Sequence, residues 1–125
     1  MTMKPIFLVD DSPTILMSMS DILTKAGYAV EKAASGQDAL KRAQGGLAPA
    51  LMITDYHMPG MTGVELIREV RKLPAFRFAP ILVLTTESQQ DKRTEAKAAG
   101  ATGWLVKPVP ADQLLQVIKQ VAPGA

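Results

Sequence analysis

The sequence predicts an α/β fold, a doubly wound five-stranded parallel sheet built from five strand-then-helix units. Two observations carry this prediction. Five short apolar runs alternate with five longer amphipathic stretches along the 125 residues. The runs are almost continuously apolar, as strands buried on both faces are, and strands that alternate with helices are typical of a parallel sheet covered by helices. Right-handed crossovers leave few topologies for such a chain.

The predicted strands are short and end at polar or turn-forming residues. The run at 79–85 is the most apolar, and 29–34 alternates between apolar and polar residues. Runs of this length that are bounded by Gly, Pro and Asp favour strands over helices. In chain order we predict strands at 5–10, 29–34, 50–54, 79–85 and 103–107.

The predicted helices carry recognisable start and stop signals. In the first, Ser12 is a suitable N-cap, Pro13 fits the first helical position and Gly27 ends the helix. The third is expected to bury a narrow apolar stripe. The fourth has little to bury beyond alanines, so we expect the fourth helix to pack loosely on the core. The predicted helices are 12–27, 35–46, 63–73 (with a stripe of Val64, Ile67, Val70 and Arg71), 89–100 and 110–121.

Composition indicates an ordinary globular domain over residues 1–125. The chain is 47% hydrophobic and 21% charged, and its net charge of +2 is too small to argue for nucleic-acid binding. The absence of cysteine excludes disulfides and thiolate metal sites. No signal peptide or membrane-spanning run is found. We therefore expect a single cytoplasmic domain, with no output domain after the last helix.

Polar side chains gather where the predicted strands end. Asp10 and Asp11 follow the first strand, Asp55 follows the third, Thr85 ends the fourth and Lys107 ends the fifth. Each alone would be an ordinary cap, turn or surface residue. Because the carboxyl ends of parallel strands share one edge of the sheet, where ligands bind, we expect all five to converge.

Converging carboxylates need a cation. Two carboxylates 4 Å apart repel by about 4 kcal/mol at an effective dielectric constant near 20. Oxygen ligands with open positions suit Mg²⁺, and Lys107 relieves part of the repulsion without metal. A site with Mg²⁺, a lysine and a hydroxyl suits phosphoryl transfer, in which one carboxylate can act as nucleophile and form an acyl phosphate. Asp55, alone at the centre of the edge, is the best candidate.

Four motifs resemble the response-regulator receiver domain. They are "VDDS" at 9–12, "ITDYHMPGMTG" at 53–63, "LTTE" at 84–87 and "GWLVKPV" at 103–109. The resemblance covers essentially the whole chain and is strongest to the single-domain, CheY-like branch of the family, which acts in chemotaxis. It implies a flavodoxin-like sheet with strand order 2-1-3-4-5, an order that the residues alone leave open.

The resemblance also implies a role for each site residue. Asp55 would accept a phosphoryl group from the phosphohistidine of a histidine kinase, and the protein would catalyse only its own phosphorylation and dephosphorylation. Thr85 and Lys107 would bind the phosphoryl group, and the Lys107–Pro108 peptide would be cis. The implied Mg²⁺ ligands are Asp10, Asp11, Asp55 and the backbone carbonyl of His57.

Three further residues are implied to act in switching and tuning. Trp104 stands at the aromatic switch position, which is commonly Tyr or Phe in the family. His57 and Glu87 stand where side chains tune the acyl-phosphate lifetime. His57 is the only histidine, and its ring has no plausible His or Cys partner for a metal.

The resemblance implies an output through protein contact. The expected partner surface comprises the fourth helix, the fifth strand and the fifth helix of a monomer, with no role for nucleic acid or membrane. A flagellar switch is one candidate partner. The alternatives are a phosphate sink for another kinase and a receiver-like module that binds its partner constitutively.

Two other classes share parts of this pattern. A flavodoxin-like flavin carrier needs a hydroxyl- and Gly-rich loop after the first strand, where "DDSPT" would repel a flavin phosphate. A haloacid-dehalogenase-type phosphatase also uses an aspartyl nucleophile, but it needs that residue after the first strand with a second Asp two residues on. His57 occupies the second position after Asp55.

Overall fold

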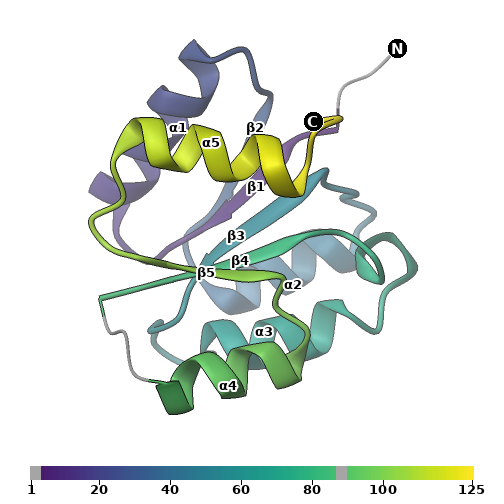
Figure 1. Cartoon of the computed structure of the whole chain (residues 1–125). Coiled ribbons are helices and arrows are strands. Elements are labelled where there is room, and N and C mark those ends of the chain that lie inside the picture. The colour runs from purple at the N-terminus through teal and green to yellow at the C-terminus, as the bar shows by residue number, and fades with distance from the viewer. Residues whose placement is uncertain (1–3, 87–89) are drawn as a thin grey trace.

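The chain folds into five alternating strands and helices, as the sequence predicts (Figure 1). The computed structural model describes residues 4–86 and 90–125, without the side chains of residues 90 and 91. The strands are β1 (Ile6–Val9), β2 (Val30–Ala33), β3 (Leu51–Asp55), β4 (Ile81–Thr85) and β5 (Gly103–Val106). The helices are α1 (Pro13–Lys25), α2 (Gly36–Gln44), α3 (Gly63–Val70), α4 (Gln90–Ala99) and α5 (Ala111–Val121), with a 3₁₀ turn at Pro74–Phe76.

The sheet has the order β2-β1-β3-β4-β5, with every neighbouring pair parallel. This confirms the strand order implied by the receiver-domain resemblance. β3 is the central strand, and β2 and β5 are the edges. The register aligns Val9 with Thr54 and Thr85 with Val106, so the polar residues that follow the strands lie at one edge of the sheet.

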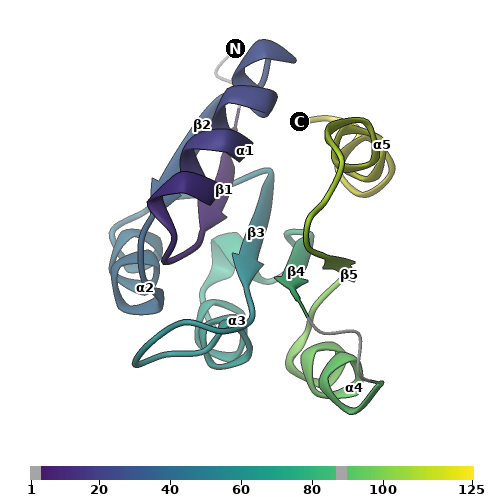
Figure 2. The ribbon, with the colours of Figure 1, turned by 90° about the vertical axis from the view of Figure 1, so that its left-hand side faces the viewer.

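Helices cover both faces of the sheet, α1 and α5 on one and α2, α3 and α4 on the other (Figures 1 and 2). Successive strand side chains point to opposite faces, so each strand supplies both cores. Phe7, Met52 and Val83 belong to the core beneath α2–α4. Leu8 and Ile53 belong to the core beneath α1 and α5. Two packed layers therefore fix the central strands rigidly.

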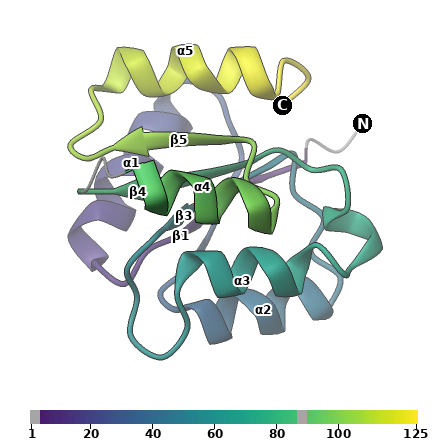
Figure 3. The ribbon, with the colours of Figure 1, turned by 60° about the horizontal axis from the view of Figure 1, so that its bottom comes forward.

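α4 buries few side chains beyond alanines, as predicted. Among the residues of α4 whose side chains are described, only Ala96 and Ala99 are buried. α3, which lies beside α4 in Figure 3, buries Val64, Leu66, Ile67 and Val70. α4 is thus held with little apolar area.

No helix in the described ranges is long and apolar enough to cross a membrane.

The end of α3 differs from the prediction. The helix stops at Val70, three residues early, and Arg71 does not extend the apolar stripe. Its guanidinium donates to the carbonyl oxygens of Phe76 (2.5 Å), Arg77 (3.3 Å), Ala79 (2.6 Å) and Gly100 (2.6 Å). Arg71 therefore ties the segment before β4 to the C-terminal end of α4, because a planar guanidinium has enough donors for several carbonyls.

Candidate functional site

Asp55 is the last residue of β3, at the centre of the sheet edge. The predicted strand ended one residue earlier, but the ladder with β4 continues and aligns Asp55 with Leu84. The side chain is held at the mouth of a rigid strand and the residue is only 6% exposed. Gly63 is required nearby, because a Cβ there would overlap the carbonyl oxygen of Asp55.

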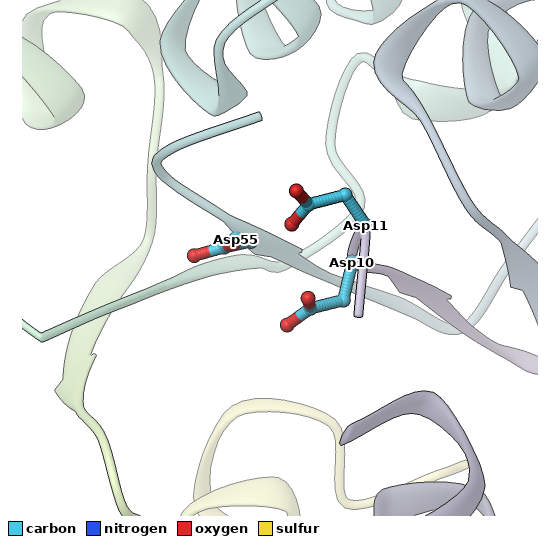
Figure 4. A group of neighbouring side chains, drawn as sticks. All are labelled: Asp10, Asp11 and Asp55. Atoms are coloured by element: carbon cyan, nitrogen blue, oxygen red, sulfur yellow. The ribbon is translucent and has the colours of Figure 1, made fainter. Parts of the chain in front are cut away.

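The residues after β1 bring two more carboxylates to Asp55. Asp10 is 2% exposed and accepts a hydrogen bond from the Ser12 backbone N–H (2.9 Å), while Asp11 is exposed. One carboxylate oxygen from each of Asp10, Asp11 and Asp55 lies within 4.8 Å of the others (Figure 4). The predicted convergence of the three acids is therefore present in the fold.

Lys107 places an ammonium group between two of these acids. Its Nζ lies 2.9 Å from Asp10 Oδ2 and 3.2 Å from Asp55 Oδ1, and its side chain is 15% exposed. The backbone N–H of Lys107 donates to the carbonyl of Thr85 (2.7 Å). The following peptide, Lys107–Pro108, is cis, as expected. Lys107, directly after the outer strand β5, thus places one positive charge beside Asp55 at the carboxyl ends of the central strands.

Burial and charge shift the protonation equilibria of the central pair. Burial raises the pKa of Asp55, the charge of Asp10 raises it further, and Lys107 offsets only part of this. Burial disfavours the charged form of Lys107, but its hydrogen bond with Asp10 and the charges of Asp10 and Asp55 outweigh that effect and raise its pKa. The anionic form of the Asp55 side chain is therefore less stabilised than that of an exposed carboxylate. This makes the Asp55 anion a better nucleophile.

The remaining predicted residues lie around this centre. Thr85 is buried at the end of β4, next to Lys107 through the backbone. Trp104 lies on the edge strand β5, with its ring centroid 6.0 Å from that of Tyr56. His57 is exposed in the segment that follows Asp55. Glu87, predicted to tune the acyl phosphate, lies outside the described residues.

Sequence reasoning missed a group of side chains that joins the segment after Asp55 to α4. Tyr56 and His57 stack edge to face with ring centroids 4.7 Å apart. Lys92 Nζ lies 3.4 Å from His57 Nε2 and 5.1 Å from the Tyr56 ring centroid. The Tyr56 hydroxyl donates to Glu95 Oε2 at 3.2 Å. We call Tyr56, His57, Lys92 and Glu95 the aromatic–charge cluster; the aromatic pair after Asp55 was its only signal in the sequence.

The donor set at the sheet edge fits a hard divalent cation. Three carboxylates and one ammonium leave the site with two net negative charges, and carboxylate oxygens are the ligands that Mg²⁺ prefers. A site that combines these acids with a lysine and a buried hydroxyl at Thr85 can hold a phosphoryl group, with cationic groups facing its oxygens.

The fold and this site define the class of the protein. The family model described as the response regulator receiver domain matches residues 6–119, so the chain belongs to that family. Receiver domains are signalling modules of two-component systems and are generally not enzymes acting on other substrates. The match covers every strand and nearly all of the last helix.

Individual relatives agree with this assignment. The protein PilH of Pseudomonas aeruginosa is 35% identical over 98% of this chain and all of its own length. The solved structure of the Vibrio cholerae chemotaxis protein CheY4 superposes with a TM-score of 0.91 at 45% identity, covering 96% of this chain and 99% of that one. The receiver domain of a sensor histidine kinase from Pseudomonas aeruginosa, solved with magnesium in its active-site cleft, is 26% identical, with a TM-score of 0.88 and coverage of 98% and 99%.

Proposed function

We propose that this protein is a response regulator that accepts a phosphoryl group on Asp55 from a histidine kinase and signals by phosphorylation-dependent protein binding. The observation that carries the proposal is the position of Asp55, nearly buried on the central strand and 3.2 Å from the Lys107 ammonium. The similarity to PilH and to the chemotaxis protein CheY4 supports a role in chemotaxis or motility. We further propose that the protein is a monomer.

We infer that Asp10, Asp11 and Asp55, with the backbone carbonyl of His57, hold Mg²⁺. Support comes from the three converging carboxylates and from the magnesium ion in the related receiver domain. Bound there, Mg²⁺ would supply the positive charge that offsets the oxygens of an incoming phosphoryl group. Asp11, the exposed member, leaves the set open to solvent and to the phosphodonor.

The proposed reaction is a displacement at phosphorus. An Asp55 oxygen attacks the phosphorus of the donor phosphohistidine, the P–N bond breaks, and the imidazole leaves and takes up a proton. The product at Asp55 is an acyl phosphate. Lys107 then pairs with a phosphoryl oxygen, and the Thr85 hydroxyl donates to another. Lys107 and Thr85 thus face the negative charge on the oxygens of the incoming phosphoryl group, so they stabilise both the transition state and the product.

We propose that the partner surface comprises α4, β5 and α5. α4 buries little, and β5 is an edge strand that leaves Val106 39% exposed. A pocket of about 200 Å³ lies between α4 and β5, with Arg93, Lys97 and Trp104 among its lining residues. Light packing allows α4 to shift when Thr85 and Trp104 rearrange, which would couple the site to this surface.

Incubation with Mg²⁺ and acetyl phosphate tests the proposal directly. Intact-mass measurement should show one added phosphoryl group on the wild type and none on Asp55→Asn. The phosphorylated protein should then bind its partner, captured from the same organism, more tightly than the Asp55→Asn variant does. Equal labelling of the variant would refute the acceptor assignment. Equal binding by both forms would favour a constitutive binding module instead.

A further inference from the structure

One hydrogen bond joins the residue after the phosphoacceptor to the middle of α4. Tyr56 directly follows Asp55, and its hydroxyl donates to Glu95 Oε2 at 3.2 Å. Tyr56 is only 7% exposed, whereas Glu95 is an exposed residue of the helix. The bond therefore connects a buried side chain beside the phosphorylation site to a helix of the proposed partner surface.

The Tyr56 end of this bond is fixed to the central strands. Its backbone N–H donates to the carbonyl of Leu84 on β4 (2.7 Å), and its carbonyl accepts from the N–H of Gly63, the first residue of α3 (2.9 Å). The Tyr56 ring belongs to the core beneath α2–α4. Because this position is fixed, the bond forms only when Glu95, and α4 with it, lies at one particular place over the sheet.

α4 is anchored at its C-terminal end. The Arg71 guanidinium donates twice to the carbonyl of Gly100, at 3.2 and 2.6 Å. Along the helix, the buried residues among the described side chains are Ala96 and Ala99, so little apolar area opposes a rotation about the anchored end. A contact about one turn before this end, at Glu95, can therefore influence where the rest of α4 lies.

We propose that Glu95 is a positioning residue: through the Tyr56 hydroxyl it holds α4 in the resting position and so weakens phosphoryl binding at Asp55. This inference rests on the proposed function, in which α4 shifts when the site is phosphorylated. A hydrogen bond that exists only in the resting arrangement stabilises that arrangement alone, so phosphorylation has to break it. By thermodynamic linkage, removing the bond beforehand raises the affinity of the site for a phosphoryl group.

The length of the bond suits this role. At 3.2 Å, the distance between the Tyr56 and Glu95 oxygens exceeds the roughly 2.7–2.8 Å that is usual for an O–H···O bond. A bond of this length is weak enough to break when the site is occupied. Glu95 does not touch the reacting atoms; it acts through Tyr56 and the position of α4.

Binding of beryllofluoride, a mimic of the phosphoryl group, tests the proposal in a double-mutant cycle. Isothermal titration calorimetry at saturating Mg²⁺ measures the dissociation constant for the wild type, Tyr56→Phe, Glu95→Ala and the double variant. Each single change should tighten binding about fivefold, which corresponds to the roughly 1 kcal/mol that one hydrogen bond contributes. The double variant should bind no more tightly than either single variant. Glu95→Gln, which keeps an acceptor oxygen, should bind as the wild type does.

The other tyrosine of the chain provides a matched control. Tyr28 lies between α1 and β2 and packs against the opposite core, so Tyr28→Phe should leave beryllofluoride affinity unchanged. Affinity for Mg²⁺ alone should also be unchanged in every variant, because the bond acts through α4 and not on the three acids.

Three results would overturn the inference. The first is a beryllofluoride affinity that is unchanged or weakened in Tyr56→Phe and Glu95→Ala. The second is additive tightening in the double variant, which would mean that the two residues act separately. The third is an equal gain in affinity for Mg²⁺ alone, which would indicate a general effect on the acids. A wild type that binds no beryllofluoride would instead refute the proposed function.

Discussion

Adding Mg²⁺ should stabilise this protein against heat, and replacing Asp11 should remove most of that effect. The three carboxylates lie within 4.8 Å of one another, and at an effective dielectric constant near 20 two such charges repel by about 3.5 kcal/mol. In the described part of the chain, the ion pairs of Lys107 are with Asp10 and Asp55, so the charge of Asp11 adds repulsion that these pairs do not offset. A divalent cation that binds only the folded site relieves this repulsion.

The size of the shift follows from mass action. At a Mg²⁺ concentration ten times the dissociation constant, binding to the native state adds about 1.4 kcal/mol to the free energy of unfolding. At about 2.1 cal/mol/K per residue, the unfolding entropy of 125 residues is about 0.26 kcal/mol/K. The melting temperature should therefore rise by about 5 °C.

The assay is thermal unfolding followed by circular dichroism, with NaCl adjusted to equal ionic strength. Asp11→Ala should lose most of the Mg²⁺-dependent increase, because Asp11 is an exposed cluster member whose removal leaves the core intact. Asp21→Ala removes an exposed acid of α1 outside the cluster and should keep the full increase. Identical melting curves with and without Mg²⁺, or an equal increase in Asp11→Ala, would refute the reasoning.

Three further predictions follow from single residues. Arg71→Met should lower the free energy of unfolding by about 3 kcal/mol in urea titrations, because four carbonyls lose a charged donor; a loss below about 1 kcal/mol would contradict that role. In the described part of the chain the Trp104 indole N–H is buried without a hydrogen-bond partner, although the residue as a whole is half-buried; acrylamide should quench its fluorescence less with Mg²⁺ and beryllofluoride than without them, and equal quenching in both states would exclude it as the switch. The pKa of Lys107 is raised above its ordinary value of 10.5. The charged lysine therefore contributes its full stabilisation of the fold below pH 10.5 and loses it as the pH rises through the higher pKa of the folded protein. Lys107→Met should flatten this alkaline decline in urea midpoints, and an unchanged slope would argue against the ion pairs.

The sequence allowed the core of the site to be predicted because parallel topology alone brings strand ends together. Once five apolar runs were read as parallel strands, Asp10, Asp55 and Lys107 had to reach one edge, whatever the loop conformations. The structure has Lys107 within 3.2 Å of both acids. The order of the strands required the family resemblance, since the right-handed crossover rule permits several orders.

Features that depend on the docking of one helix against another element were not predictable. The spacing of Arg71 resembles an apolar stripe, but its guanidinium faces carbonyls of a segment that packs there only in the folded chain. Likewise, nothing in the sequence of α4 marks Lys92 as a neighbour of His57, 35 residues earlier. Among its described side chains α4 buries only Ala96 and Ala99, so its sequence carries no broad apolar stripe that would indicate which elements it packs against.

Locating the phosphoryl group is the measurement that tests the central claim most directly. After reaction with acetyl phosphate and Mg²⁺, borohydride reduces an aspartyl phosphate to homoserine, and peptide mass spectrometry identifies the position. We predict homoserine at position 55 alone, formed only when Mg²⁺ is present and absent after treatment of the unphosphorylated protein. Homoserine at position 10 or 11, or phosphate retained on His57 with Asp55 unchanged, would contradict the account.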